Sequence, residues 1–192
     1  MTHLFWVRHG PTHQKVFTGW RDVPADLSDG ATLARVSAFL PPSAGVISSD
    51  LSRAVATADA IASNRPRLTP DPALREFDFG AWDGLSFEQV AARDPDLSRT
   101  FWESPGDVAP PDGESWNMVA TRVHAAIDAA VRVRPGHPLI AVAHFGAILT
   151  HLSTAGGIAP IQALSHHIDP LSITELRHGS DGWQIVRINH IA

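Results

Sequence analysis

The amino-acid sequence predicts a three-layer αβα sandwich around a largely parallel β-sheet. Short apolar runs that suit strands buried on both faces alternate with segments whose apolar residues recur at helical spacing. Such alternation is typical of α/β domains, in which helices cover both faces of a parallel sheet. The 192 residues, 44% of them hydrophobic, can bury one sizeable core, so we expect a single domain over residues 1–192.

The first strand and the first helix are expected in the N-terminal 40 residues. An apolar run at 4–7 predicts a buried strand, and Arg8 and His9 follow at its carboxyl end. Residues 27–40 are expected to form a helix, with Ser28 as its N-cap and a pair of prolines as its stop.

A second strand and a second helix follow. The strand is expected at 45–48, and from Leu51 onward apolar residues recur at helical spacing. Ser49 and Asp50 are the candidate N-caps of this helix. Arg53 then lies in its first turn, close to the end of the preceding strand.

Residues 94–114 combine several prolines with small polar residues. This composition favours an irregular flap over a packed core element.

The last 80 residues alternate again between helices and strands. We expect a long helix at 115–134, a fully buried strand at 138–143 and a helix at 146–154. Alternating patterns at 172–176 and 183–188, joined by a glycine-containing turn, predict a closing hairpin.

The expected strand ends carry the candidate functional residues. In open α/β sheets ligands bind beyond the carboxyl ends of the strands, and Arg8, His9 and His144 all follow apolar strands. Phosphoryl transfer needs cations around the equatorial oxygens, an in-line nucleophile and an acid for the leaving oxygen. Arg8 and Arg53 supply forked donors, and the two histidines supply imidazoles.

Composition and charge exclude several function classes. The net charge of −5 gives no general attraction for nucleic acid or anionic lipid, so an anion must be held by a local cluster of cations. The absence of cysteine excludes disulfides, thiolate zinc sites and cysteine nucleophiles. Without a recognisable secretory leader or a run of about 18 apolar residues, we expect a cytoplasmic protein that contacts neither a membrane nor nucleic acid.

Five ordered blocks carry a resemblance to a known family. Val7 to Thr12 (VRHGPT) resembles the Arg-His-Gly signature of the histidine phosphatase, or phosphoglycerate mutase-like, superfamily. The other four blocks resemble that family's further motifs and lie at Phe17 to Pro24, Ser48 to Ala54, Leu74 to Gly84 and Val142 to His144. The triplet alone is weak evidence, whereas five blocks in order are strong evidence.

The resemblance implies a phosphoglycerate mutase-like fold and a division of catalytic roles. It implies His9 as the phosphohistidine nucleophile and Glu76 as the general acid and base, with no metal and no cofactor. Arg8, Arg53 and His144 would clamp the phosphate. His9 must be neutral to attack phosphorus, and neighbouring cations would oppose its protonation.

Other carboxylates compete with Glu76 for the acid role. Asp78, Asp83 and Glu88 lie nearby in the sequence and remain alternatives.

The motif blocks also suggest residues that contact substrate. Thr12, Thr18 and Gly19 belong to blocks that implicate them in substrate binding. Lys15 and Phe145 depart from the family pattern. Lys15 could bind a second phosphate or carboxylate, and the alternative is a solvated loop lysine.

Three tryptophans and one acidic segment have both a structural and a functional interpretation. Trp82, Trp102 and Trp116 could form an apolar wall for a leaving group, or simply pack in the core. Residues Asp112 to Ser115 resemble a family segment that opens the helix beside the pocket. The simpler interpretation is that Glu114 lies on the surface and that Ser115 caps the following helix.

A metal site is conceivable but not favoured. His166 and His167 are adjacent, and His144 and His151 lie seven residues apart. Adjacent side chains rarely share one metal, and no third ligand lies at matching spacing.

The sequence therefore favours hydrolysis of a small phosphomonoester through phospho-His9. A nucleotide-like or sugar phosphate is a candidate substrate, as for the family's α-ribazole phosphatases. The alternatives are a cofactor-dependent phosphoglycerate mutase-type phosphotransferase and a non-catalytic phosphate-ester binding protein. The expected partner is a small phosphorylated metabolite, with a homodimer as a further possibility.

Overall fold

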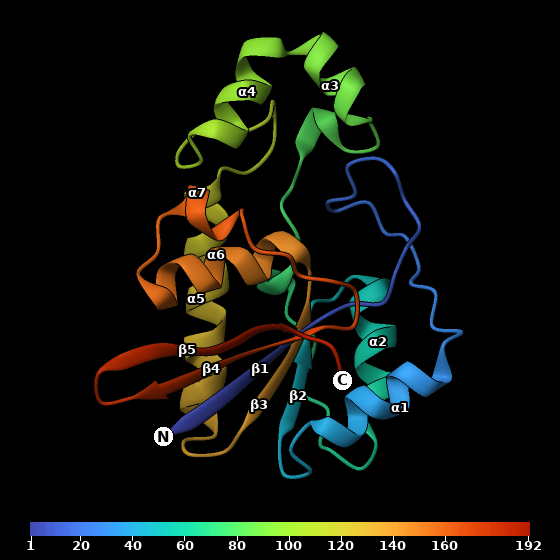
Figure 1. Ribbon diagram of the computed structural model, residues 1–192, viewed down its shortest axis with the longest axis vertical. Helices are drawn as coiled ribbons and strands as arrows, with labels where there is room; N and C mark the ends of the chain where they lie inside the picture. The colour runs from blue at the N-terminus through green and yellow to red at the C-terminus, as the bar shows by residue number, and fades with distance from the viewer.

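A computed structural model describes residues 1–192 and contains a mixed five-stranded sheet in the order β2-β3-β1-β4-β5 (Figure 1). The strands are β1 (Thr2–Arg8), β2 (Gly45–Ser48), β3 (Leu139–Ala143), β4 (Ile173–Gly179) and β5 (Gly182–His190). β3 pairs in parallel with β1 and β2, whereas β4 pairs antiparallel with β1 and with β5. The predicted largely parallel sheet is therefore corrected to a mixed one, because the closing hairpin joins its edge.

Helices pack against both faces of this sheet. The α-helices are α1 (Gly30–Phe39), α2 (Ser52–Ala62), α3 (Phe87–Arg93), α4 (Pro95–Glu103), α5 (Trp116–Val133), α6 (Phe145–Gly156) and α7 (Pro160–Ala163), and the four that cover the sheet are α1, α2, α5 and α6. Buried residues of α1 and α2 share a core with Phe5 and Val7 of β1. Buried residues of α5 and α6 share a second core with Leu4 and Trp6. Successive side chains of β1 thus enter opposite cores, as the pleat of a strand requires.

The first helix begins later than predicted. Asp29, not Ser28, is the N-cap of α1, and its carboxylate accepts a hydrogen bond from the Thr32 amide at 3.0 Å.

The second helix lacks the predicted side-chain cap. Leu51 occupies the N-cap position of α2, so neither Ser49 nor Asp50 has this role. The Asp50 carboxylate instead pairs with the Arg75 guanidinium at 2.6 Å. Arg53 does lie in the first turn, as predicted.

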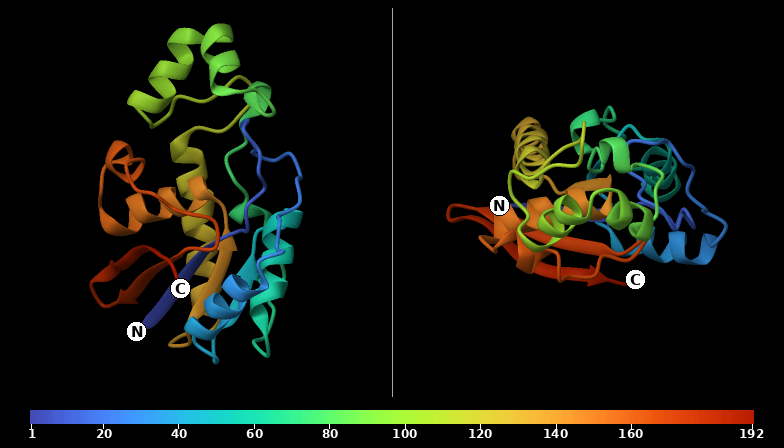
Figure 2. Two further views of the ribbon diagram at one scale, coloured as in Figure 1. Left: turned by 45° about the vertical axis from the view of Figure 1, so that its right-hand side comes forward. Right: turned by 90° about the horizontal axis from the view of Figure 1, so that it is seen from above.

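The region predicted as an irregular flap contains a helix. α4 begins at Pro95, where a first-turn proline loses no hydrogen bond, so this proline starts the helix and does not interrupt it. α3, which the sequence analysis missed, begins with a capping box between Ser86 and Gln89. Figures 1 and 2 show α3 and α4 together at one end of the molecule, away from the sheet. We call residues Phe87–Glu103 the lid.

The second half of the chain follows the predicted order more closely. Ser115 caps α5 by accepting a hydrogen bond from the Met118 amide at 3.3 Å, as expected.

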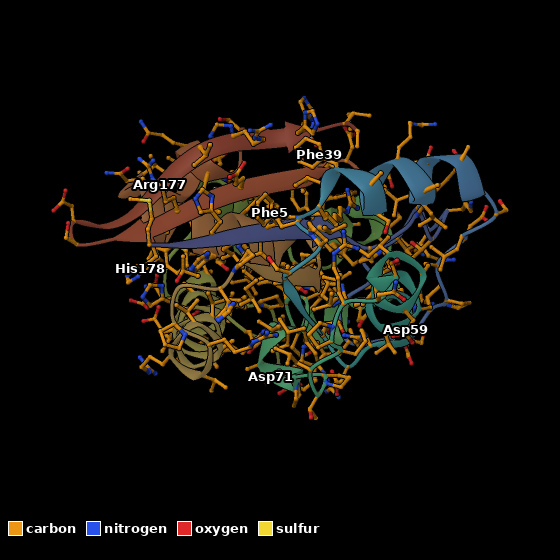
Figure 3. The ribbon with its side chains drawn as sticks, turned by 90° about the horizontal axis from the view of Figure 1, so that it is seen from below. Phe5, Phe39, Asp59, Asp71, Arg177 and His178 are labelled. Atoms are coloured by element: carbon orange, nitrogen blue, oxygen red, sulfur yellow. The ribbon has the colours of Figure 1, made fainter.

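Seen from below, Asp59 of α2 and His178 of β4 lie toward opposite sides of the molecule (Figure 3). No helix has the length and apolarity needed to cross a bilayer.

Candidate active site

Two parallel strands bring the candidate histidines together. β1 and β3 pair in register so that Arg8 lies opposite Ala143, and the His9 amide donates to the Ala143 carbonyl at 2.9 Å. His9 and His144 are the next residues along the two strands. Their ring centroids are consequently 5.0 Å apart.

The main chain sets the tautomer of His9. Its Nδ1 lies 2.7 Å from the Gly10 carbonyl, which can only accept, so Nδ1 carries the proton. Nε2 then keeps a lone pair. Burial, reinforced by the charges of Arg53 and Arg8 and opposed by the Gly10 hydrogen bond, lowers the pKa of His9 to about 3. The imidazole is neutral at neutral pH and fit to act as a nucleophile.

Gly10 lies in a closely packed turn. A Cβ at this position would meet the Leu27 side chain at 2.6 Å. The Gly10 amide also donates to the Thr57 hydroxyl at 3.0 Å, which anchors the turn after β1 to α2.

Arg53 is fixed from several sides and orients the second histidine. Its guanidinium is 1% exposed and donates to the carbonyls of Gly19 at 2.6 Å and Arg21 at 3.0 Å. Its Nε donates to His144 Nδ1 at 3.2 Å. Nδ1 of His144 must therefore accept, so the proton of the neutral ring lies on Nε2. That buried N–H has no protein partner.

Arg8 completes the group of cations. Its Nη1 donates to the Ile168 carbonyl at 2.6 Å, and its Nε is buried without a partner. Burial lowers the pKa of both Arg8 and Arg53, while the Glu76 charge acts in the opposite direction. Guanidinium groups remain charged in proteins, so the site carries a local positive charge in an acidic chain.

Glu76 is buried on the same side of the sheet edge. It is 7% exposed, and its two carboxyl oxygens accept from the amides of Phe77 at 3.0 Å and Gly146 at 3.1 Å. A Cβ on Gly146 would meet a Glu76 oxygen at 2.5 Å. The first turn of α6 therefore needs glycine here for the carboxyl group to approach.

A cavity of about 240 Å³ joins most of the predicted residues. Arg8, His9, Arg53 and Glu76 line it together. Predicted substrate-contact residues also line it, namely Thr12, Thr18 and Phe145, as does Trp102, one of the tryptophans considered for an apolar wall. The unpredicted residues of the lining are Gln14, Val16, Phe17, Phe79 and Phe87.

Three predicted residues lie outside the cavity wall. His144 is fully buried beside His9. Gly19 is packed against the Phe77 carbonyl and contributes its own carbonyl to Arg53. Lys15 is exposed on the loop after β1.

The family model for the histidine phosphatase superfamily (branch 1) matches residues 4–191. The chain belongs to this superfamily.

Individual relatives agree with that membership. The Bifunctional protein Rv2228c of Mycobacterium tuberculosis is 33% identical over 203 residues, covering 97% of this chain and 53% of its own length, so the chain spans about half of it. A 2,3-bisphosphoglycerate-dependent phosphoglycerate mutase of Brucella anthropi is 28% identical, with 86% of this chain and 87% of the mutase covered. The mycobacterial glucosyl-3-phosphoglycerate phosphatase Rv2419c, solved with VO3, is 26% identical with a TM-score of 0.84, and the alignment covers 97% of this chain and 98% of that one.

The other carboxylates of this histidine phosphatase domain have structural partners. Asp83 accepts from the amides of Gly19 and Arg21, and Asp78 accepts from the Gly80 amide. None of the three alternatives, Glu88 included, lines the cavity. Glu76 alone of the candidate acids does.

A buried ion pair holds the Glu76 segment. The Arg122 guanidinium donates to the main-chain carbonyls of Ala73, Arg75 and Glu76 at 2.7–2.9 Å and pairs with the Glu114 carboxylate at 2.6 Å. The Glu114 side chain is only 13% exposed, so its predicted surface position is wrong. No pattern in the sequence marks Arg122 as a functional residue, because a lone arginine on an amphipathic helix resembles a solvated one.

Of the three tryptophans, Trp82 and Trp116 pack in the core and Trp102 forms part of the cavity wall. Trp82 is fully buried, and its indole N–H donates to Asp94 at 2.8 Å, which makes it a core residue. Trp116 is 4% exposed and packs against Phe77. Trp102 of the lid lines the cavity.

Two of the four histidines considered as metal ligands, His144 and His151, have other partners. His144 Nδ1 accepts from Arg53, and His151 Nδ1 accepts from the Trp6 indole at 3.1 Å. No three His, Asp or Glu side chains are grouped so that they could share a metal ion.

Proposed function

We propose that this chain is a metal-independent phosphatase that hydrolyses a small phosphomonoester through a phosphohistidine on His9. One observation carries the proposal. A neutral imidazole with an unprotonated Nε2 lines the same cavity as two guanidinium groups and one buried carboxyl group. These are the nucleophile, the equatorial cations and the acid that phosphoryl transfer needs.

In the first half-reaction the lone pair of His9 Nε2 attacks phosphorus. The bond between phosphorus and the ester oxygen breaks as Glu76 gives its proton to that oxygen, and the alcohol leaves. Arg8, Arg53 and the Nε2–H of His144 donate to the three equatorial oxygens.

In the second half-reaction water replaces the alcohol. The Glu76 carboxylate takes a proton from water as its oxygen attacks phosphorus, and the bond from phosphorus to nitrogen breaks. Inorganic phosphate leaves, and both His9 and Glu76 return to their starting protonation states.

The charge of the cavity favours hydrolysis over mutase chemistry. A bisphosphoglycerate-dependent mutase must hold a second phosphate and a carboxylate in the same site. Arg8 and Arg53 are the cations that line this cavity, and both are assigned to the transferred phosphate. A non-catalytic phosphate binder would not need Glu76 anchored beside the nucleophile.

The test is hydrolysis of an aryl phosphate in excess chelator, with vanadate as inhibitor and acid-labile, base-stable phosphate measured on the protein. We expect activity in chelator, inhibition by vanadate, and loss of both turnover and labelling in His9→Ala. His167→Ala, which removes an exposed histidine, is the matched control. Activity that disappears with chelator and returns with a divalent ion would overturn the proposal. Transfer to phosphoglycerate, with little release to water, would favour the mutase.

A further inference from the structure

A second, smaller pocket of about 40 Å³ adjoins the reaction cavity. It shares Glu76, Phe79, Trp102 and Phe145 with the cavity, so the two spaces meet around the proposed acid. The rest of its wall is formed by Phe77, Phe101, Pro105, Trp116, Gly146 and Leu164.

The pocket wall is apolar apart from Glu76, and its rings pack against one another. Phe77 contacts Phe101 and Trp116 at centroid distances of 6.1 and 6.0 Å. Phe101 and Trp102 meet edge to face at 4.8 Å. Such packing gives a preformed apolar surface, with two of its rings supplied by the lid.

The reaction geometry directs the leaving group toward this pocket. In an in-line displacement the leaving oxygen departs on the side opposite the attacking nitrogen. His9 does not line the small pocket, whereas Glu76, which must reach the leaving oxygen, lines both spaces. The aromatic wall around Glu76 is therefore the surface that the carbon next to that oxygen would meet.

The wall discriminates between leaving groups by their polarity. A buried hydroxyl group without a partner costs free energy, whereas buried methylene groups are favourable. No cation lines the small pocket. A carboxylate or a second phosphate there would therefore lie beside Glu76 with no positive charge to offset its own negative charge.

From this arrangement we infer that the pocket is the leaving-group site and that the enzyme prefers phosphate monoesters of short apolar alcohols. The inference rests on the proposed function and specifies its substrate class. The pocket is small, at about 40 Å³, so it holds the tip of a short alkyl chain or the edge of a ring.

The first test is a series of ethyl, propyl and butyl phosphates. The value of kcat/KM should rise by about fourfold per methylene group until the pocket is full and then level off. Propyl phosphate should exceed glyceryl phosphate by about tenfold, although glycerol is the better leaving alcohol. 3-Phosphoglycerate should be poorer still. A flat series, or a preference for the glyceryl or the anionic ester, would overturn the inference.

The second test changes the pocket without touching the catalytic residues. Leu164 is half-buried and lines the small pocket but not the reaction cavity. Leu164→Phe should fill the pocket and lower the ratio of kcat/KM for butyl phosphate to kcat/KM for ethyl phosphate about tenfold. Ile161→Phe, on the exposed face of α7, is the matched control and should change neither ester.

The two tests separate failure of the inference from failure of the proposed function. If no ester forms phospho-His9, the proposed function itself is wrong. If all esters form it at similar rates in both the wild type and Leu164→Phe, only the leaving-group site is wrong.

Discussion

The two sides of the cavity are built differently. On the phosphate side, His9 and His144 follow paired parallel strands, and Arg53 is held by main-chain carbonyls. On the proposed leaving-group side, Glu76 lies on a loop that is held by the Arg122–Glu114 pair, and the lid supplies two rings of the apolar wall. The phosphate side is fixed by the sheet, whereas the leaving-group side depends on side chains from separate segments.

This difference has a kinetic consequence. Every ester presents the same phosphate, so a change on the phosphate side should affect all substrates alike. Leaving groups differ in basicity and polarity, so a change on the other side should affect some esters far more than others.

The largest selective effect is expected from Glu76→Gln, which keeps the size of the side chain and one of its two main-chain hydrogen bonds but cannot deliver a proton. An alkoxide leaves poorly without that proton, whereas nitrophenolate departs largely unaided. We expect a loss on the order of 10² to 10⁴ in phosphorylation of His9 by alkyl esters and a much smaller loss with the nitrophenyl ester.

Water attack also needs a base, so phospho-His9 should accumulate in this variant. Rapid mixing with the nitrophenyl ester should give a burst followed by slow turnover. Equal losses on both esters without a burst would exclude Glu76 as the acid and would favour Asp78 or Asp83 in that role.

The phosphate side is also the part that the sequence predicted best. The strand runs predicted that Arg8, His9 and His144 lie at the same edge of the sheet, whereas Arg53 was assigned to the site from the motif that resembles the family's second arginine motif. Parallel pairing of β1 with β3 brings His144 beside His9.

The leaving-group side was harder to predict because its contacts join distant segments. The Trp102 ring stacks with Phe17 of the loop after β1 at a centroid distance of 5.9 Å, and Arg122 contacts carbonyls about 46 to 49 residues away. No local pattern encodes either contact. The prolines of 94–114 were equally ambiguous, since Pro95 suits the first turn of a helix as well as a loop.

A smaller loss of activity, again selective for alkyl esters, is expected when Arg122 no longer holds the Glu76 segment. Arg122→Lys keeps the charge but cannot reach three carbonyls and a carboxylate at once. Displacement of Glu76 should lower kcat for alkyl esters about 10- to 100-fold and spare the nitrophenyl ester, with KM little changed. Arg132→Lys, an exposed position on the same helix, is the control. An equal loss with both esters would mean a general packing defect.

On the phosphate side, the buried His9 should make stability depend on pH. The unfolded chain binds a proton at a histidine with an ordinary pKa near 6.5, whereas the folded chain does so only near a pKa of about 3. Unfolding therefore takes up protons, and stability present above pH 6.5 is lost progressively as the pH falls toward 3.

Removing the imidazole should remove its share of this loss. Denaturant titrations between pH 6.5 and 4 measure how steeply the free energy of unfolding falls with pH. This slope should be shallower for His9→Gln than for the wild type, and the two slopes should differ by at most about 1.4 kcal/mol per pH unit. The exposed His167→Gln serves as control. Parallel curves for the wild type and His9→Gln would contradict a buried, neutral His9.

The smallest effect is expected at Lys15, where the sequence suggested a contact with a second anionic group. The side chain is exposed and does not line the cavity, so it should contribute little to either side of the site. Lys15→Ala should change KM by less than about twofold for both simple esters and esters that carry a distal carboxylate, as expected when no binding interaction is lost. Steady-state kinetics at low ionic strength give the strictest comparison, because screening by salt is then weakest. A rise in KM confined to the anionic esters would restore Lys15 as a substrate contact. It would also mean that the leaving-group side accepts charge at its rim, beyond the apolar wall formed by Trp102 and Phe145.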